Sequence, residues 1–256
     1  MALSELSSEV MDAETAQAEA LPSTPPGRGP NLNQLRPDQI CIYRADRAAD
    51  DDDDDEDNSE YRAMDYVCEY KPPHKLTAAH LRLGLRPMHI PSEVVRRGKL
   101  PADVDLDTKF AYYADLFTAS AVTQTYHYMI EAGLEYGLLT TGVAIVFLHI
   151  DWQDAATLYY HLAEPNSEVA AHVNQTTMCT AVGQYLAFTL LAVGVPGQLR
   201  MHQQEERRIA TARLGTWRID LDIEVQRAPE GGRWPLARRC RQSVDHRGSD
   251  RVHAAQ

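Results

Sequence analysis

The chain has few cysteines, no long apolar run and none of the short motifs that mark common enzyme sites. Its four cysteines (Cys41, Cys68, Cys179 and Cys240) form no CxxC pair and no zinc-ligand spacing. It has no Gly-x-Ser-x-Gly, HExxH, Walker A or Gly-x-Gly-x-x-Gly motif, and no protein-kinase set of Gly-rich loop, His-Arg-Asp and Asp-Phe-Gly. These absences exclude a motif-bearing serine hydrolase, zinc protease, P-loop enzyme or kinase.

Targeting signals are also missing. The first ten residues carry neither a basic n-region nor an apolar h-region. No apolar run reaches the roughly 18–20 residues that span a bilayer. We therefore expect an intracellular protein of the cytoplasm or nucleus, with no membrane segment and with buried, reduced cysteines.

Composition indicates one folded domain with polar ends. Hydrophobic residues make up 44% of the 256, which is enough for a core. The net charge is −12, and the run from Asp50 to Asp57 supplies eight of the acidic residues. Such a run repels itself and is typical of a solvated loop. We expect a disordered or loosely helical tail over 1–30, a domain over 31–226 with an acidic disordered insertion at about 46–60, and a disordered basic tail over 227–256.

Apolar periodicity predicts the secondary structure of that domain. Strands are expected at about 39–44, 63–71, 134–139, 143–150 and 157–162. Helices are expected at 76–85, 108–132 and 176–193, the last of them covering the sheet. The fold class is therefore α/β, with a central mixed sheet of about four to five strands flanked by helices.

The two first predicted strands carry a group of polar side chains. Pro37-Asp38 opens one strand, where a proline is tolerated, and Glu69-Tyr70-Lys71 closes the next. Glu69 and Lys71 are two residues apart, so their side chains point to the same face of the strand. Two carboxylates and a lysine on adjacent strands can hold a divalent metal beside a nucleophilic water, which is the chemistry of phosphodiester cleavage.

The long helix adds an unexpected amide to its apolar face. Gln124 and Tyr128 lie one turn apart and continue the stripe formed by Phe110, Tyr113 and Phe117. Burying an amide without a partner costs on the order of 1–3 kcal/mol, so Gln124 needs a polar neighbour. The Asp38, Glu69 and Lys71 group would supply one. The alternative is that Glu69 and Lys71 are a salt-bridged strand pair and Gln124 is a satisfied core amide.

This ordered set, over residues 36–165, resembles the PD-(D/E)xK nuclease superfamily with its Gln-x-x-x-Tyr helix. The phrases Arg36–Tyr43, Glu69–Leu76 and Gln124–Glu131 are similar to a family of uncharacterised fungal proteins, often joined to a protein-kinase-like domain. The resemblance implies a restriction-endonuclease-like core.

The resemblance also implies roles for the residues that match. Asp38 and Glu69 would bind Mg²⁺ or Mn²⁺, with the Tyr70 carbonyl as a third ligand. Lys71 would orient or deprotonate the attacking water. Gln124 would position the lysine or a water, and Tyr128 would brace the helix.

Basic residues are concentrated directly after Lys71. Between Lys71 and Lys99 there are seven basic residues and one acid, Glu93. Such a segment suits a nucleic-acid backbone, and Lys75, Arg82 and Arg86 are the candidate contacts. A solvated helix surface or a site for an acidic partner would have the same composition.

Three functions remain open from the sequence. The first is a metal-dependent nuclease-like domain that hydrolyses phosphodiester bonds in DNA. The second is a catalytically inactive module of the same fold that binds nucleic acid or regulates a kinase-like partner domain missing from this chain. The third is an interaction protein whose acidic loop recruits basic partners.

Overall fold

The structure is a computed structural model that describes residues 37–45, 61–98, 100–101, 103–194, 201–212, 214–215, 217, 221–229 and 250–253. Its strands are β1 (Gln39–Ala45), β2 (Tyr61–Tyr70), β3 (Met88–His89), β4 (Tyr136–Thr140), β5 (Ile145–Ile150), β6 (Thr157–Ala163) and β7 (Asp250–His253). Its α-helices are α1 (Ala78–Gly84), α2 (Leu106–Ala132), α3 (Pro165–Ala171), α4 (Thr176–Cys179), α5 (Ala181–Val193), α6 (Gln204–Ala212) and α7 (Leu221–Arg227). A π-helical turn, η1 (Pro91–Val95), and a 3₁₀ turn, η2 (Trp152–Asp154), complete the described elements.

The strands form one mixed sheet in the order β1-β2-β4-β5-β6-β7-β3. The β2–β4 and β7–β3 pairs are parallel, and the other pairs are antiparallel. Five longer strands make the body of the sheet, and the short β7 and β3 extend one edge. The predicted α/β class, the mixed sheet and the antiparallel pairing of the first two strands are confirmed.

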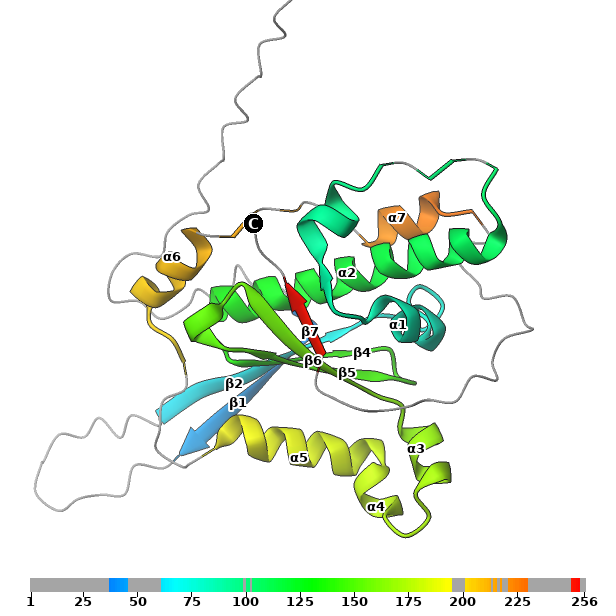
Figure 1. Cartoon of the computed structure of the whole chain (residues 1–256). Helices are drawn as coiled ribbons and strands as arrows, with labels where there is room; N and C mark the ends of the chain where they lie inside the picture. The colour runs from blue at the N-terminus through cyan, green and yellow to red at the C-terminus, as the bar shows by residue number, and fades with distance from the viewer. Residues whose placement is uncertain are drawn as a thin grey trace, which may run out of the picture.

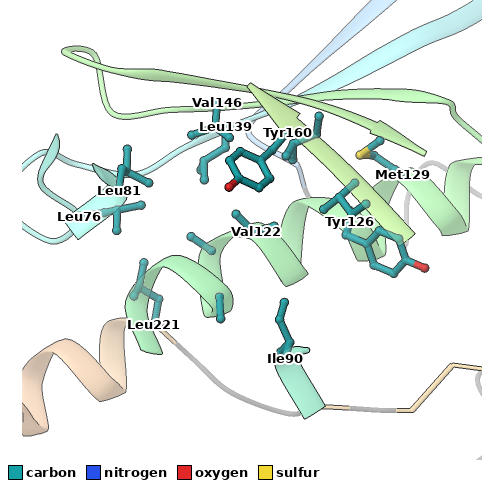
Figure 2. Close-up of a cluster of buried hydrophobic side chains, with 14 of the residues drawn as sticks. Leu76, Leu81, Ile90, Val122, Tyr126, Met129, Leu139, Val146, Tyr160 and Leu221 are labelled. Atoms are coloured by element: carbon teal, nitrogen blue, oxygen red, sulfur yellow. The ribbon is translucent and has the colours of Figure 1, made fainter. Parts of the chain in front are cut away.

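Helices cover both faces of this sheet (Figure 1). The long helix α2 crosses one face together with α1, α7 packs on the outer side of α2, and α5 lies along the other face of the sheet. Figure 2 shows Val122 of α2 opposite Leu139 and Val146 of the sheet, with Tyr126 and Met129 further along the helix, and all five belong to the larger hydrophobic cluster. Because β4 and β5 are covered on both faces, their sequences are nearly continuous apolar runs.

A β-bulge in β2 sets which of its side chains face α2. Cys41 pairs with Tyr66 but Ile42 pairs with Met64, so Asp65 is the extra residue. Because of this insertion, Met64 and Val67 both join the α2-side cluster, whereas Tyr66 joins the α5-side cluster. Regular alternation from Val67 onward then directs Glu69 and Lys71 toward α2.

Local signals fix both ends of α2. The Asp105 carboxylate accepts the Thr108 backbone N–H at 2.9 Å, which caps the first turn. Gly133 ends the helix in the left-handed region, with φ of 72°. The predicted helix over 108–132 is confirmed, as is α1, which is capped by Thr77.

Two predictions need correction. The single helix predicted over 176–193 is two helices, because Thr180 breaks the run and its hydroxyl caps α5 by accepting the Gly183 N–H at 3.0 Å. Within the tail predicted as disordered over 227–256, residues 250–253 form β7 between β6 and β3, and residues 230–249 and 254–256 lie outside the described residues. Residues 250–253 are Asp-Arg-Val-His and show no alternation of apolar and polar side chains. The sequence pattern therefore does not predict that their backbone pairs with β6 and β3. The tail predicted at 1–30 and the insertion predicted at about 46–60 lie outside the described residues.

Among the described residues, none of the helices is both long and apolar enough to cross a bilayer.

Candidate active site

Four of the five predicted catalytic residues meet between β2 and α2. The Lys71 ammonium donates to Glu69 Oε1 at 2.6 Å and to Gln124 Oε1 at 2.8 Å. The Gln124 amide in turn donates through Nε2 to the Tyr128 hydroxyl at 3.1 Å. The four side chains form a continuous chain of hydrogen bonds from strand to helix.

The ends of two strands hold this arrangement in place. The Lys71 backbone N–H donates to the Thr140 carbonyl at 2.8 Å, which continues the parallel pairing of β2 with β4 by one residue. Two prolines follow Lys71 and prevent further pairing. Gln124 and Tyr128 lie on the same face of α2 because they are four residues apart.

The Asp38 side chain contacts the backbone of Tyr70, between Glu69 and Lys71. Asp38 stands directly before β1, whose first residue Gln39 pairs with Cys68. Its carboxylate accepts the Tyr70 backbone N–H at 2.7 Å. Asp38 is exposed, and the structure therefore places it at the rim of the site, beside the end of β2.

Glu69 is the most deeply buried member, with 3% of its surface exposed. Burial raises the pKa of its carboxyl group, whereas the hydrogen bond and the charge of Lys71 lower it, and the net direction is upward. The nearby negative charge of Asp38 raises the pKa further. A carboxylate whose charge is opposed both by burial and by a neighbouring acid is an arrangement that a bound cation relieves.

One oxygen atom of the site is suited to bind a divalent cation. Glu69 Oε1 bonds Lys71, but Oε2 is buried and has no hydrogen-bond partner. A buried, unpartnered carboxylate oxygen is costly unless a ligand takes it up. No group of three or more His, Cys, Asp or Glu side chains is gathered for a metal in the described part of the chain. A cation here would therefore need backbone oxygens or waters as well, which suits Mg²⁺.

The three cations predicted to contact nucleic acid are all ion-paired. Lys75 bonds Asp222 at 2.9 Å, and Arg82 bonds Glu164 with two hydrogen bonds of 2.7 and 2.5 Å. Arg86 bonds Glu93 at 2.8 Å and Asp115 at 3.2 Å. The structure thus brings these residues to acids from other elements rather than to Lys71.

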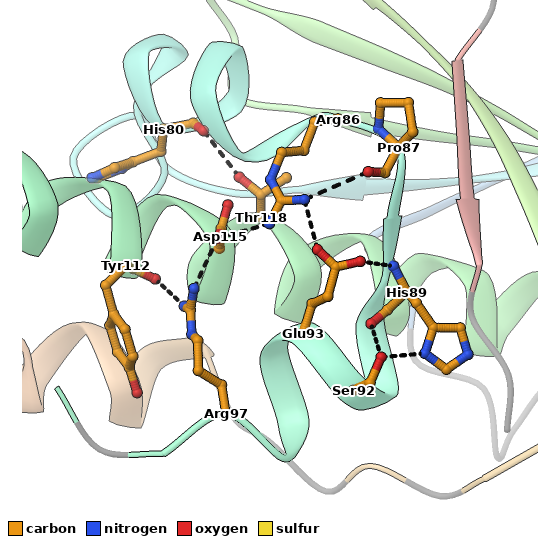
Figure 3. Close-up of polar contacts among 10 residues, drawn as sticks. All are labelled: His80, Arg86, Pro87, His89, Ser92, Glu93, Arg97, Tyr112, Asp115 and Thr118. Carbon is orange, nitrogen blue, oxygen red and sulfur yellow. Dashed lines mark hydrogen bonds and ion pairs between the residues drawn. The ribbon is translucent and has the colours of Figure 1, made fainter.

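Arg97 extends the Arg86 network (Figure 3). Its guanidinium bonds Asp115 at 2.9 Å and the Tyr112 carbonyl at 2.8 Å. It also lies 4.0 Å from the centre of the Tyr112 ring. The buried Asp115 therefore receives two arginines, and this network fastens the segment after α1 to α2. Sequence reasoning missed Asp115 as the partner, because an acid inside a helix has no local sign of its cation.

The other face of β2 is held by α5. The Tyr66 and Thr189 hydroxyls are hydrogen-bonded at 2.9 Å, and the Tyr66 ring packs edge-on against Phe188. Burial raises the pKa of the neighbouring Cys68 thiol to about 11, so Cys68 is a neutral core residue.

Residues 57–218 match the model of the Spore killer 2 N-terminal domain. The chain belongs to this family. It is 30% identical over 158 residues to the protein "Meiotic driver SPOK2" of Podospora anserina (strain S). That match covers 59% of this chain and 20% of the relative, so the chain corresponds to about a fifth of the driver's length. No solved structure matches the chain. Within the Spore killer 2 N-terminal match lie Glu69, Lys71, Gln124 and Tyr128, and Asp38 precedes it.

Proposed function

We propose that the chain is a nuclease-like domain of the PD-(D/E)xK type that hydrolyses phosphodiester bonds in DNA with Mg²⁺ or Mn²⁺. One observation carries the proposal. Lys71 is held between Glu69 and Gln124, while Glu69 keeps a second, buried oxygen without a partner. Because the matched relative is a meiotic driver, we infer that this activity serves meiotic drive.

Asp38 and Glu69 are the residues that would hold the metal, with the Tyr70 carbonyl as the third protein ligand. A divalent cation at such a site supplies charge for the phosphate oxygens and lowers the pKa of a bound water. The rest of the chemistry belongs to the chain's own side chains.

Lys71 supplies a fixed positive charge with one donor to spare. An ammonium group has three N–H donors, and two of them are taken by Glu69 and Gln124. The third is available to orient a water or to bond a phosphate oxygen as negative charge develops. Tyr128 accepts the Gln124 amide hydrogen, which keeps the Gln124 carbonyl oxygen turned toward Lys71.

A plasmid-nicking assay tests the proposal. The purified chain should nick supercoiled DNA with Mg²⁺ or Mn²⁺ and lose this activity with EDTA. Lys71→Ala should lower the rate by about 100-fold or more, and Gln124→Leu by about tenfold, because it removes one of the two anchors of the lysine. Lys109→Ala removes a lysine elsewhere on α2 and should leave the rate unchanged. Nicking that persists in Lys71→Ala would come from a contaminant and would contradict the proposal.

A second candidate is the inactive module of the same fold, which binds nucleic acid or regulates a kinase-like partner domain. The ion pairs of Lys75, Arg82 and Arg86, in a chain of net charge −12, favour it because they leave little free positive charge for DNA. Calorimetric titration separates the two candidates. Mg²⁺ and Mn²⁺ affinity that is millimolar or absent indicates the inactive module, and tighter binding that Glu69→Gln weakens indicates the nuclease.

A further inference from the structure

Helix α5 has its polar side chains turned inward. Gln184 donates to Glu168 Oε2 at 2.6 Å and to the Cys179 carbonyl at 3.0 Å. The Thr189 hydroxyl bonds the Tyr185 carbonyl and the Tyr66 hydroxyl, both at 2.9 Å. No residue of α5 is charged. Its few polar groups are therefore satisfied against the rest of the protein.

The outer face of α5 is apolar and exposed. The exposed fractions are 78% for Val182, 59% for Leu186, 64% for Leu190 and 56% for Leu191. Met178 of the adjoining α4 adds a further side chain that is 70% exposed. A surface helix ordinarily presents polar residues to water, so this orientation is inverted. None of the described elements covers this side of α5 (Figure 1).

We propose that the outer face of α5 binds the same face of a second copy of this chain. Val182, Leu186 and Leu190 are spaced four residues apart and form a single ridge. Ridges with this spacing pack into one another in the commonest class of helix crossing, at about −50°. An antiparallel pair related by a two-fold axis would place Leu186 next to its own copy and Val182 near Leu190. The small, exposed Ala187 beside this ridge lets the two helices approach closely.

The size and chemistry of the face favour a second copy. Five apolar side chains that are each more than half exposed amount to roughly 500 Å² of apolar surface, at about 100 Å² per side chain. Two such faces would bury roughly 1,000 Å² in total, which is about the smallest area expected of a specific interface. Neither copy would have to bury a charge, because α5 has none.

A membrane surface is a poorer match for this face. Helices that lie in the membrane interface carry lysine or arginine on their polar side to attract anionic lipids. The other side of α5 is packed on the sheet and has no cation.

Sedimentation velocity over a range of protein concentrations tests the proposal. The wild-type chain should sediment as a dimer at micromolar concentration, and Leu186→Glu as a monomer with an unchanged far-UV spectrum. The matched control is Ile209→Glu, which alters an exposed apolar residue of α6 and should leave the dimer intact.

A charge exchange then tests the two-fold contact. Leu186→Lys alone should also be monomeric, and an equal mixture of Leu186→Glu with Leu186→Lys should recover dimers, because the two charges meet at the axis. A wild-type chain that is monomeric at 100 micromolar, a Leu186→Glu chain that stays dimeric, or flotation of the wild type with anionic vesicles would overturn the proposal.

Discussion

Glu69 is ionisable at a position where burial opposes its charge. Because burial raises its pKa above the ordinary 4.5, the folded protein binds this proton more readily than the unfolded chain does. At pH values above this raised pKa, Glu69 is ionised in the folded protein, and its buried charge lowers the free energy of unfolding. That penalty is relieved as the pH falls through the raised pKa toward 4.5.

We expect Glu69→Gln to be more stable than the wild type at pH 8, with the difference shrinking as the pH falls toward 4.5. Urea denaturation at several pH values measures this difference. Glu93→Gln is the control of opposite sign, because the His89 backbone hydrogen bond and Arg86 lower the Glu93 pKa. That variant should be less stable at pH 8 and approach the wild type only at acid pH. A Glu69→Gln difference that is constant from pH 5 to 8 would show that burial of the charge is not penalised.

The sequence predicted contacts between residues that are close in the chain, but it did not predict contacts between residues that are far apart in it. Glu69 and Lys71 share a strand face, and Gln124 and Tyr128 share a helix face, so short spacings indicated both halves of the site. Arg86 has one nearby partner, Glu93, but the other partners of Lys75, Arg82 and Arg86 lie far along the chain, at Asp222, Glu164 and Asp115. No local pattern marks such a pair, and a segment that looks like free positive charge in the sequence is neutralised in the fold.

Helix α2 is the element that connects the core to the site, and Gly133, the residue that follows it, fixes its length. Gly133 has φ of 72°, and a Cβ there would clash with the His202 carbonyl oxygen. The His202 N–H also donates to the Gly133 carbonyl at 2.8 Å, so the backbone of the two segments is in direct contact. A side chain at Gly133 would have to push apart α2 and the segment that leads into α6.

We therefore expect Gly133→Ala to lower the free energy of unfolding by roughly 1–3 kcal/mol, from the left-handed backbone and the clash together. Gly98→Ala is the matched control, because a Cβ at Gly98 meets no atom within 4 Å. That variant should be as stable as the wild type. Chemical denaturation of the two variants measures both values, and equal stabilities would mean that the end of α2 adjusts to a side chain.

Helices and strands were predictable where the chain has a capping residue at the end of a helix or a long run of apolar residues. Asp105 and Gly133 bound α2, and the apolar run before Ile150 indicates β5. The break at Thr180 was missed because apolar residues continue on both sides of it, so periodicity alone predicts one helix. The four residues of β7 were missed because backbone pairing, and not apolar alternation, places them in the sheet.

At the scale of the whole molecule, β7 joins two strands, β3 and β6, that lie far apart in the sequence. Residues 250–253 pair with Thr157–Tyr160 of β6 on one side and with Met88–His89 on the other. The Spore killer 2 N-terminal match ends at residue 218, so this strand lies beyond the matched segment. The His89 backbone N–H in turn donates to Glu93, which bonds Arg86. The sheet edge and the Arg86 network are therefore continuous.

We expect a chain that ends at residue 249 to lose about 2–4 kcal/mol of stability, because β6 loses its hydrogen-bonded neighbour and β3 loses its place in the sheet. For a protein of this size the melting temperature should fall by roughly 5–10 °C. A chain that ends at residue 253 keeps β7 and is the control. Limited proteolysis should also cut the shortened chain sooner between residues 86 and 98, since that segment is fastened both by β3 and by the arginine network. Equal melting temperatures for the two chains would contradict a structural role for β7. Faster cleavage elsewhere, with 86–98 still protected, would show that the Asp115 contacts of Arg86 and Arg97 hold the segment without the strand.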